Sequence, residues 1–312
     1  MRRAWNWVLS SYPYRVWLTF RDAGGNLLAA GMSYQLLFAV FAGVWVLFAV
    51  ANNLFTTRPT LRDAVIGIIN SQVPGLIDEN GPIYPSMLEQ HSSMTITGLL
   101  ALVATLFTAV TWLAYARVAM RRIFDLPAIT KVPYAFLKAH DLLIAIVYGI
   151  LLIASGIASV LMTRTIDSIS NLFGLTDTDP RTVELLRALG VVIVFSIDTV
   201  MLALFIRIMS GLLIPWRRIL VGSLLGGVAL GLFKIDATLY IGEASNNPLL
   251  ASVALFIGLL VWFNLSSRVI LLSAAWIATD LKDKNIQPRD IGWMFHRGTQ
   301  PHGRRPRQEL RT

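Results

Sequence analysis

Apolar residues in this chain collect in long runs that are separated by shorter polar connections. A run of roughly 20 predominantly apolar residues is long enough to cross the hydrocarbon core of a bilayer as a helix. Because an open strand would leave backbone groups unpaired in hydrocarbon, each run is expected to be helical. Six runs are long enough: about 27–51, 96–118, 141–162, 188–214, 218–239 and 249–278. The pattern therefore predicts an all-α integral membrane protein with six transmembrane helices.

The residues before the first run combine aromatic and basic side chains. The aromatic residues are Trp5, Trp7, Tyr12, Tyr14 and Trp17, with Arg15 and Arg21 among them. Aromatic rings of this kind favour the headgroup layer of a membrane. Residues 1–26 are therefore predicted to form an interfacial amphipathic helix, and a helix that binds a partner protein is the alternative.

The connection between the first two runs, about 52–95, also carries an apolar pattern. Its apolar residues recur at near-helical spacing: Leu61, Val65, Ile68, Ile69, Val73 and Leu76. This spacing predicts a helix that folds onto the outer membrane face. Pro74-Gly75 and Asn80-Gly81-Pro82 are turn signals that should end this segment.

Basic residues assign the sides of the membrane. They gather before the first run and after the second, fourth and sixth: Arg2, Arg3, Arg15, Arg21; Arg121, Arg122, Lys131, Lys138; Arg217, Arg218; Lys282, Lys284, Arg289, Arg297, Arg304, Arg305, Arg307 and Arg311. The positive-inside rule then places both termini in the cytoplasm, which agrees with an even number of spans. The chain divides into a cytoplasmic interfacial segment (1–26), a transmembrane domain (27–282) and a basic tail (283–312) that is expected to be disordered.

Composition supports lipid as the solvent and excludes several function classes. The chain has 312 residues, of which 55% are hydrophobic and 14% charged, whereas soluble domains carry about 25% charged residues. It has no cysteine, so disulfides, thiolate metal sites and cysteine nucleophiles are excluded. The formal net charge of +9 is interpreted as topology and contact with anionic membrane lipids, not as nucleic-acid binding.

The sequence contains no recognisable catalytic or cofactor-binding motif. It lacks a phosphate-binding loop, a nucleophile elbow, a dinucleotide fingerprint and a zinc-protease signature. The four histidines have no metal-ligand spacing. We therefore expect no enzyme activity, no cofactor and no metal.

The polar residues inside the runs are the candidates for function, because ionisable groups in a membrane are costly. Asp198 lies near the middle of the fourth run, where a binding role and a structural pairing are equally good interpretations. Arg117 and Arg207 lie in the inner halves of their runs, and snorkelling to the headgroups is the alternative to ligand binding. Arg268 lies too deep to snorkel comfortably. With Asn264 and Ser267, Arg268 is predicted to line a polar cavity for a phosphate or carboxylate.

Other polar and small residues have weaker signals. Gln35, Thr108 and Thr111 are possible polar lining, although hydrogen bonding between helices is the stronger interpretation. In the fifth run, Gly222 and Gly226, and then Gly227 and Gly231, are spaced four apart. Small residues at this spacing allow helices to approach closely, so they predict packing and could support a homo-oligomer.

Several stretches resemble the YihY/BrkB family of inner-membrane proteins, historically labelled ribonuclease BN. These are the alanine-rich opening of the first run at 26–40 and a block that includes Gly227–Phe233, Tyr240, Asn247-Pro248-Leu249 and Leu259–Leu265. The resemblance covers roughly residues 15–282 and implies the bacterial cytoplasmic membrane. Many members carry an acidic residue late in the sixth span, where this chain reads Ser273-Ala274-Ala275-Trp276, so no role of that residue carries over.

The resemblance implies a transporter or a lipid-handling protein. Our hypothesis is a transporter or flippase-like protein for an anionic or amphiphilic envelope lipid or small molecule. The basic inner half would hold the ligand, while Asp198 would respond to protons or a cation. A scaffold that organises envelope synthesis without transport is the alternative. Ribonuclease activity is not expected, because no group is placed to activate water against a phosphodiester.

Overall fold

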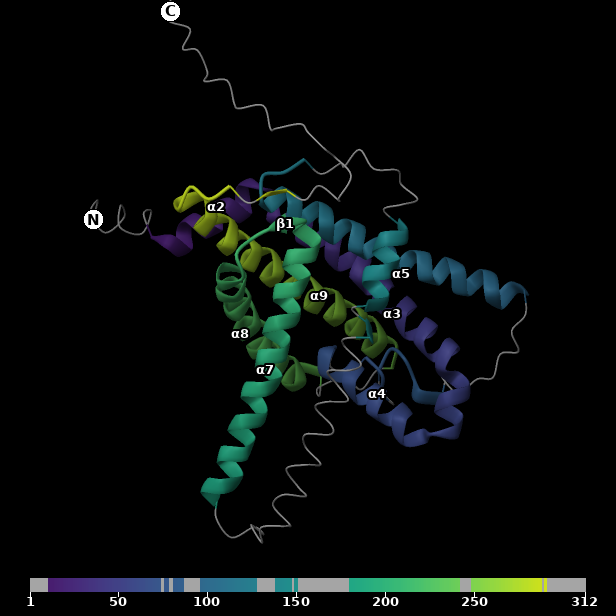
Figure 1. Cartoon of the computed structure of the whole chain (residues 1–312). Coiled ribbons are helices and arrows are strands. Elements are labelled where there is room, and N and C mark those ends of the chain that lie inside the picture. Colours follow the sequence, from purple (N-terminus) through teal and green to yellow (C-terminus); the bar gives the residue numbers. More distant parts are fainter. Residues whose placement is uncertain are drawn as a thin grey trace, which may run out of the picture.

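The computed structural model describes residues 11–73, 76–78, 81–86, 96–127, 138–147, 149–150, 180–241, 248–287 and 289–290. Long helices dominate these residues (Figure 1). The helices are α2 (Tyr12–Asp22), α3 (Gly25–Thr57), α4 (Pro59–Gln72), α5 (Ile96–Ile123), α7 (Pro180–Ser210), α8 (Trp216–Ile241) and α9 (Pro248–Asp283). Residues 138–147 and 149–150 are also helical. Two short strands, β1 (Leu212–Leu213) and β2 (Arg289–Asp290), pair antiparallel.

Three helices within the described residues are long and apolar enough to cross a membrane. They contain the stretches Gly25–Phe48, Trp216–Phe233 and Phe256–Asp283. These stretches lie in the first, fifth and sixth predicted spans. The second and fourth predicted spans are helical, in α5 and α7. The third predicted span, 141–162, is helical in its described part, and residues 151–162 lie outside the described residues.

One predicted boundary is wrong, and the backbone shows why. The fourth span was expected to continue to about residue 214, but α7 ends at Ser210. Gly211 has a φ of 66°, a left-handed conformation that ends helices and that glycine adopts without strain. Leu212 and Leu213 then extend into β1, and Pro215 directly precedes α8. A hydrophobicity pattern cannot distinguish this apolar strand from a last helical turn.

The pairing of β1 with β2 also shortens the predicted tail. Leu212 lies opposite Asp290 and Leu213 opposite Arg289, so the chain after α9 returns to the connection between α7 and α8. The sequence predicts a disordered tail over residues 283–312, but the structure describes residues 284–287 and 289–290 of this segment. The remainder of the predicted tail lies outside the described residues.

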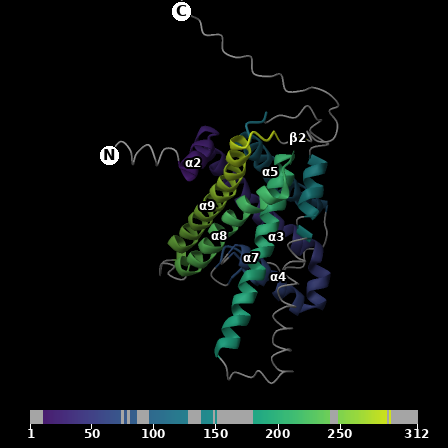
Figure 2. The same cartoon turned by 60° about the vertical axis from the view of Figure 1, so that its left-hand side comes forward.

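The long helices α3, α5, α7 and α8 all contact α9, and Figure 2 shows α8 running beside it. Helix α3 contacts both α5 and α9, while α8 contacts both α7 and α9. Helices α3 and α9 run in opposite directions, because Ser33 contacts Asn264 and Phe41 stacks on Phe256. The first and last helices that qualify as membrane spans are therefore direct neighbours.

Helix α2 packs on the C-terminal end of α9 and continues the line of α3 along it. Pro13 lies in its first turn, and Val16 and Phe20 are buried. Gly24, with a φ of 75°, makes the turn into α3, and a side chain at Gly25 would collide with the Phe20 ring. The predicted amphipathic helix is thus present over residues 12–22. Trp5 and Trp7 lie outside the described residues.

The opposite end of the bundle holds α4, which confirms the helix predicted in the first connection. Val65 of α4 packs with Val44 and Phe48 of α3 and with Leu259 and Phe263 of α9. The following segment folds back on α4 because the Asn70 side chain both donates to Ile77 O at 2.8 Å and accepts from Ile77 N at 3.0 Å. Pro74 and Gly75 lie outside the described residues.

Candidate functional site

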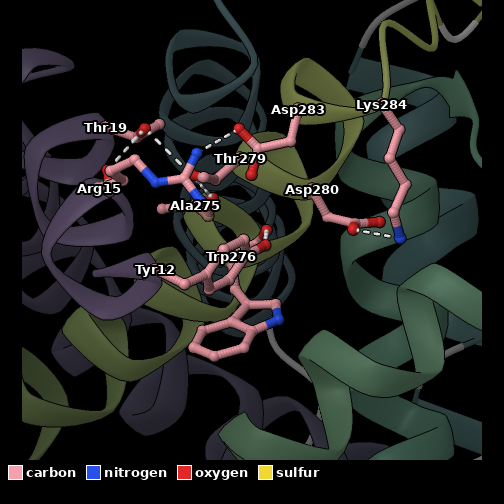
Figure 3. A network of polar contacts seen from close by, with 9 residues as sticks. All are labelled: Tyr12, Arg15, Thr19, Ala275, Trp276, Thr279, Asp280, Asp283 and Lys284. Atoms are coloured by element: carbon pink, nitrogen blue, oxygen red, sulfur yellow. Dashed lines mark hydrogen bonds and ion pairs between the residues drawn. The ribbon is translucent and has the colours of Figure 1, made fainter. Parts of the chain in front are cut away.

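A polar network joins α2 to the last turns of α9 (Figure 3). Tyr12 donates its hydroxyl to Trp276 O at 2.9 Å, and Arg15 contacts Asp283 at 2.5 Å. The Thr19 and Thr279 hydroxyls lie 3.1 Å apart. Burial, with the nearby carboxylates of Asp280 and Asp283, raises the pKa of Tyr12 to about 12, so the hydroxyl stays a donor at neutral pH. The network fixes α2 to the C-terminal end of α9.

Asp280 extends this network to α8. Its carboxylate pairs with the Arg218 guanidinium, and Lys284 Nζ lies 2.8 Å from its other oxygen. Arg218 lies in the first turn of α8, so Asp280 ties the start of α8 to the end of α9. Asp280 and Asp283 were assigned no role from the sequence, because no local pattern shows which helix each carboxylate will meet.

Among the described residues, the most deeply buried charges are on α5 and on the helical segment 138–147. Arg117 of α5 forms an ion pair with Asp141, and their side chains are only 8% and 1% exposed. Breaking a buried ion pair of this kind is costly, because the remaining charge would be left alone in apolar surroundings. Arg117 was a predicted site residue, but its partner was missed. Asp141 stands at the polar edge of the third apolar run, where an acid normally faces water.

Further basic groups surround this pair. Arg121, one turn further along α5, donates from Nε to Pro127 O at 3.0 Å and from a terminal nitrogen to Ser210 O at 3.4 Å. Lys138 donates to the Thr111 hydroxyl at 2.8 Å and lies 4.4 Å from the centroid of the Phe107 ring. His140 Nδ1 lies 3.9 Å from Asp141. We call Arg117, Arg121, Lys138, His140 and Asp141 the α5 cluster; within the described residues it holds three cations and one carboxylate.

The structure separates the three polar residues predicted to line a cavity on α9. Asn264 donates to the Ser33 hydroxyl of α3 at 3.5 Å, and Ser33 donates in turn to Ala30 O at 2.8 Å. Ser267 is fully buried, and its hydroxyl has no hydrogen-bond partner among the described residues. Arg268 is exposed on another side of α9. Consecutive helical residues point about 100° apart, so Ser267 and Arg268 do not share a face.

Two other predicted site residues lie on α7. Arg207 donates to Ile214 O at 2.7 Å and lies 4.5 Å from the centroid of the Trp216 ring, so it braces the α7–α8 connection. Asp198 is half-buried and precedes Thr199, which packs against Gly227 of α8. Asp198 is not a free charge, because it takes part in an interaction within the structure.

The weaker candidates mostly bond within their own helix. Thr108 donates to Ala104 O at 3.0 Å, and Thr111 donates to Phe107 O at 2.8 Å while it accepts from Lys138. Gln35 is half-buried on α3. Thr111 is therefore the member of this group that the structure connects to the α5 cluster.

The glycines of α8 make contacts inside the chain. Side chains at Gly222 and Gly226 would collide with Ile277 and Ser273 of α9, and one at Gly227 would lie 2.8 Å from the Thr199 hydroxyl of α7. Gly231 has nothing within 4 Å. Gly222, Gly226 and Gly227 thus let α8 approach both neighbours closely, as the spacing predicted, whereas Gly231 makes no such contact. The homo-oligomer stays a prediction.

The described residues hold no group of three His, Asp or Glu side chains that could bind a metal ion. What they do hold is a set of buried and half-buried charges at one end of a bundle of long apolar helices. Charges in such a place are expensive unless they are paired or bind a ligand. This combination defines an integral membrane protein with several candidate transmembrane helices.

Comparison with known proteins agrees with this class. The family described as virulence factor BrkB matches residues 16–290, and the chain belongs to this family. The resemblance seen in the sequence is thus confirmed. An uncharacterised protein of Dickeya dadantii (strain 3937) is 26% identical over 282 residues, which cover 83% of this chain and 80% of that protein. No solved structure matches the chain significantly.

Proposed function

We propose that the chain crosses a bacterial cytoplasmic membrane six times with both termini inside. The distribution of basic residues in the structure supports this topology. Arg15, Arg121, Arg218 and Lys284, from four different parts of the chain, lie at the end of the bundle that holds α2. Helix α4 lies at the other end, which would face outward (Figure 1).

The absence of native cysteines makes the topology directly testable. Single cysteines at Tyr84, Thr176 and Ser245 should react with a membrane-impermeant maleimide in intact spheroplasts, since each would lie in an outer connection. Cysteines at Arg122 and Asn285 should react only after the membrane is permeabilised. Labelling of Thr176→Cys exclusively after permeabilisation would contradict the six-span topology.

We further propose that the protein is a transporter or flippase-like protein for an anionic, amphiphilic envelope lipid. The observation that carries this proposal is the α5 cluster, where Arg121 and Lys138 lie on either side of the buried Arg117–Asp141 pair along α5. A charged group buried in this way is stabilised by an opposite charge, and guanidinium and ammonium groups suit phosphate. Lys138 and Arg121 are the groups that would contact the ligand, while the pair with Asp141 holds Arg117 in place.

A reconstituted assay tests the proposal. Purified protein in vesicles should move fluorescent phosphatidylglycerol or polyprenyl phosphate across the bilayer above the rate of empty vesicles. Lys138→Gln should reduce the rate about tenfold or more, because a hydrogen bond to a charged group contributes about 1.5–3 kcal/mol. Lys138→Arg keeps the charge and should retain most of the rate.

The matched control is Arg122→Gln, which removes an exposed cation from the same end of α5. Its rate should equal that of the wild type. If wild-type vesicles move neither lipid faster than empty vesicles, the transport proposal fails and the scaffold becomes the better explanation. An equal loss in Lys138→Gln and Arg122→Gln would instead remove the α5 cluster from the mechanism.

A further inference from the structure

Arg268 has an unusual position on α9. It is exposed, and it makes no hydrogen bond or ion pair with any residue that the structure describes. Val261 and Ile257, seven and eleven residues earlier, lie on the same side of the helix and are 60% and 57% exposed. Arg268 is therefore a single positive charge at one end of an exposed apolar strip.

The packing of α9 keeps Arg268 on this outer side. Leu259, Phe263 and Ile277, which lie on the opposite side of the helix, are buried. Rotating α9 to turn Arg268 inward would expose these residues and break the contacts with α3 and α8. The exposed position of the guanidinium thus follows from the packing of the whole helix.

The register of α3 against α9 gives the depth of Arg268. Asn264 contacts Ser33 of α3, and Arg268 lies one helical turn beyond Asn264 toward the basic end of the bundle. Helix α3 itself begins at Gly25, eight residues before Ser33. One turn corresponds to about 5.4 Å, so Arg268 lies roughly one turn inside the level at which α3 begins. With the membrane surface taken at the start of α3, a guanidinium at this level is within reach of lipid phosphates, in contrast to the sequence-based expectation that Arg268 lies too deep to snorkel.

We propose that Arg268 binds the phosphate of an anionic phospholipid whose acyl chains lie along Val261 and Ile257. The guanidinium matches phosphate geometry with two parallel hydrogen bonds, and the apolar strip matches hydrocarbon. A second copy of the chain fits less well, because the exposed carboxylates in the described part lie at helix ends or in connections: Asp22, Asp63, Asp78, Asp125 and Asp283. This proposal rests on the proposed function for the orientation of the chain in the membrane. It adds a lipid-binding position on the outer surface of α9, separate from the α5 cluster.

The test is lipid retention by the full chain, which does not require transport. Protein purified in detergent is mixed with phosphatidylglycerol or phosphatidylcholine, and bound lipids are counted by native mass spectrometry. Arg268→Gln should lose about threefold or more of the bound phosphatidylglycerol and keep its phosphatidylcholine, since the charge-assisted hydrogen bonds to phosphate are lost. Arg217→Gln, which removes an exposed cation at the start of α8, should retain both lipids.

Three outcomes would overturn the proposal: unchanged phosphatidylglycerol in Arg268→Gln, an equal loss in Arg217→Gln, or displacement of the lipid by millimolar inorganic phosphate. If the wild type forms dimers that are absent in Arg268→Gln, Arg268 would instead contact a second copy of the chain. Equal elution volumes and unfolding temperatures of the variants ensure that lost binding reflects the site. Intact lipid binding at Arg268 together with absent transport would refute only the proposed function.

Discussion

Replacing Arg117 by Leu should destabilise the protein severely, by about 3–5 kcal/mol. The change leaves the Asp141 carboxylate, which is 1% exposed, without its cation among apolar side chains. Asp141→Leu should cost a similar amount, because it strands the guanidinium. The measurement is thermal unfolding of the detergent-purified protein, with yield in the membrane fraction as a second readout.

The double variant Arg117→Leu/Asp141→Leu is the decisive comparison. Removing both charges avoids the stranded ion, and replacement of a buried pair by apolar side chains is often neutral. The double variant should therefore recover most of the lost stability, while its lipid transport stays impaired. Arg122→Leu, on the exposed side of the same helix, should change stability by less than about 0.5 kcal/mol. Additive losses in the double variant would show that the two residues contribute independently.

The second large effect is expected from Gly226→Leu, which should destabilise the bundle by about 2 kcal/mol or more. A side chain at this position would overlap the Ser273 hydroxyl and lie 2.7 Å from Leu202, so α8 would have to move away from both α7 and α9. The unfolding midpoint in detergent should fall by roughly 5–10 °C. Gly226→Ala should show a smaller loss in the same direction.

Gly231→Leu is the matched control on the same helix. A side chain there meets nothing within 4 Å, so its stability should remain near that of the wild type. If Gly231→Leu instead dissociates an oligomer without changing the stability of the monomer, the predicted homo-oligomer would use that glycine. Equal losses at Gly226 and Gly231 would indicate a general penalty for large side chains in α8, and the close contact with Ser273 would then not explain the effect.

Hydrophobicity and charge predicted most of the helical architecture. The long apolar runs located α3, α5, α7, α8 and α9, and the spacing from Leu61 to Val73 located α4. Periodicity works here because each of these helices has a continuous apolar surface. The end of α7 was missed, because Gly211 and the two leucines of β1 are as apolar as the helix before them.

The candidate site was less predictable, since it depends on which faces of distant helices meet. Arg117 could be selected as a buried cation, but its pairing with Asp141 requires knowing that the segment 138–150 lies against α5. Arg268 and Ser267 are adjacent in sequence, yet packing buries one and exposes the other. No local sequence pattern could predict the hydrogen bond between Tyr12 and Trp276, because the two residues are 264 positions apart.

The contact between α2 and α9 also sets an order of assembly during synthesis. The first described helix to leave the ribosome finds its partner only after about 260 further residues are made, which takes roughly 13–50 s at 5–20 residues per second. During that interval the side of α2 that packs on α9 lacks its partner. The membrane surface can bind α2 during this time. The aromatic and basic side chains of the N-terminal segment would therefore hold the nascent chain at the membrane before α9 is made.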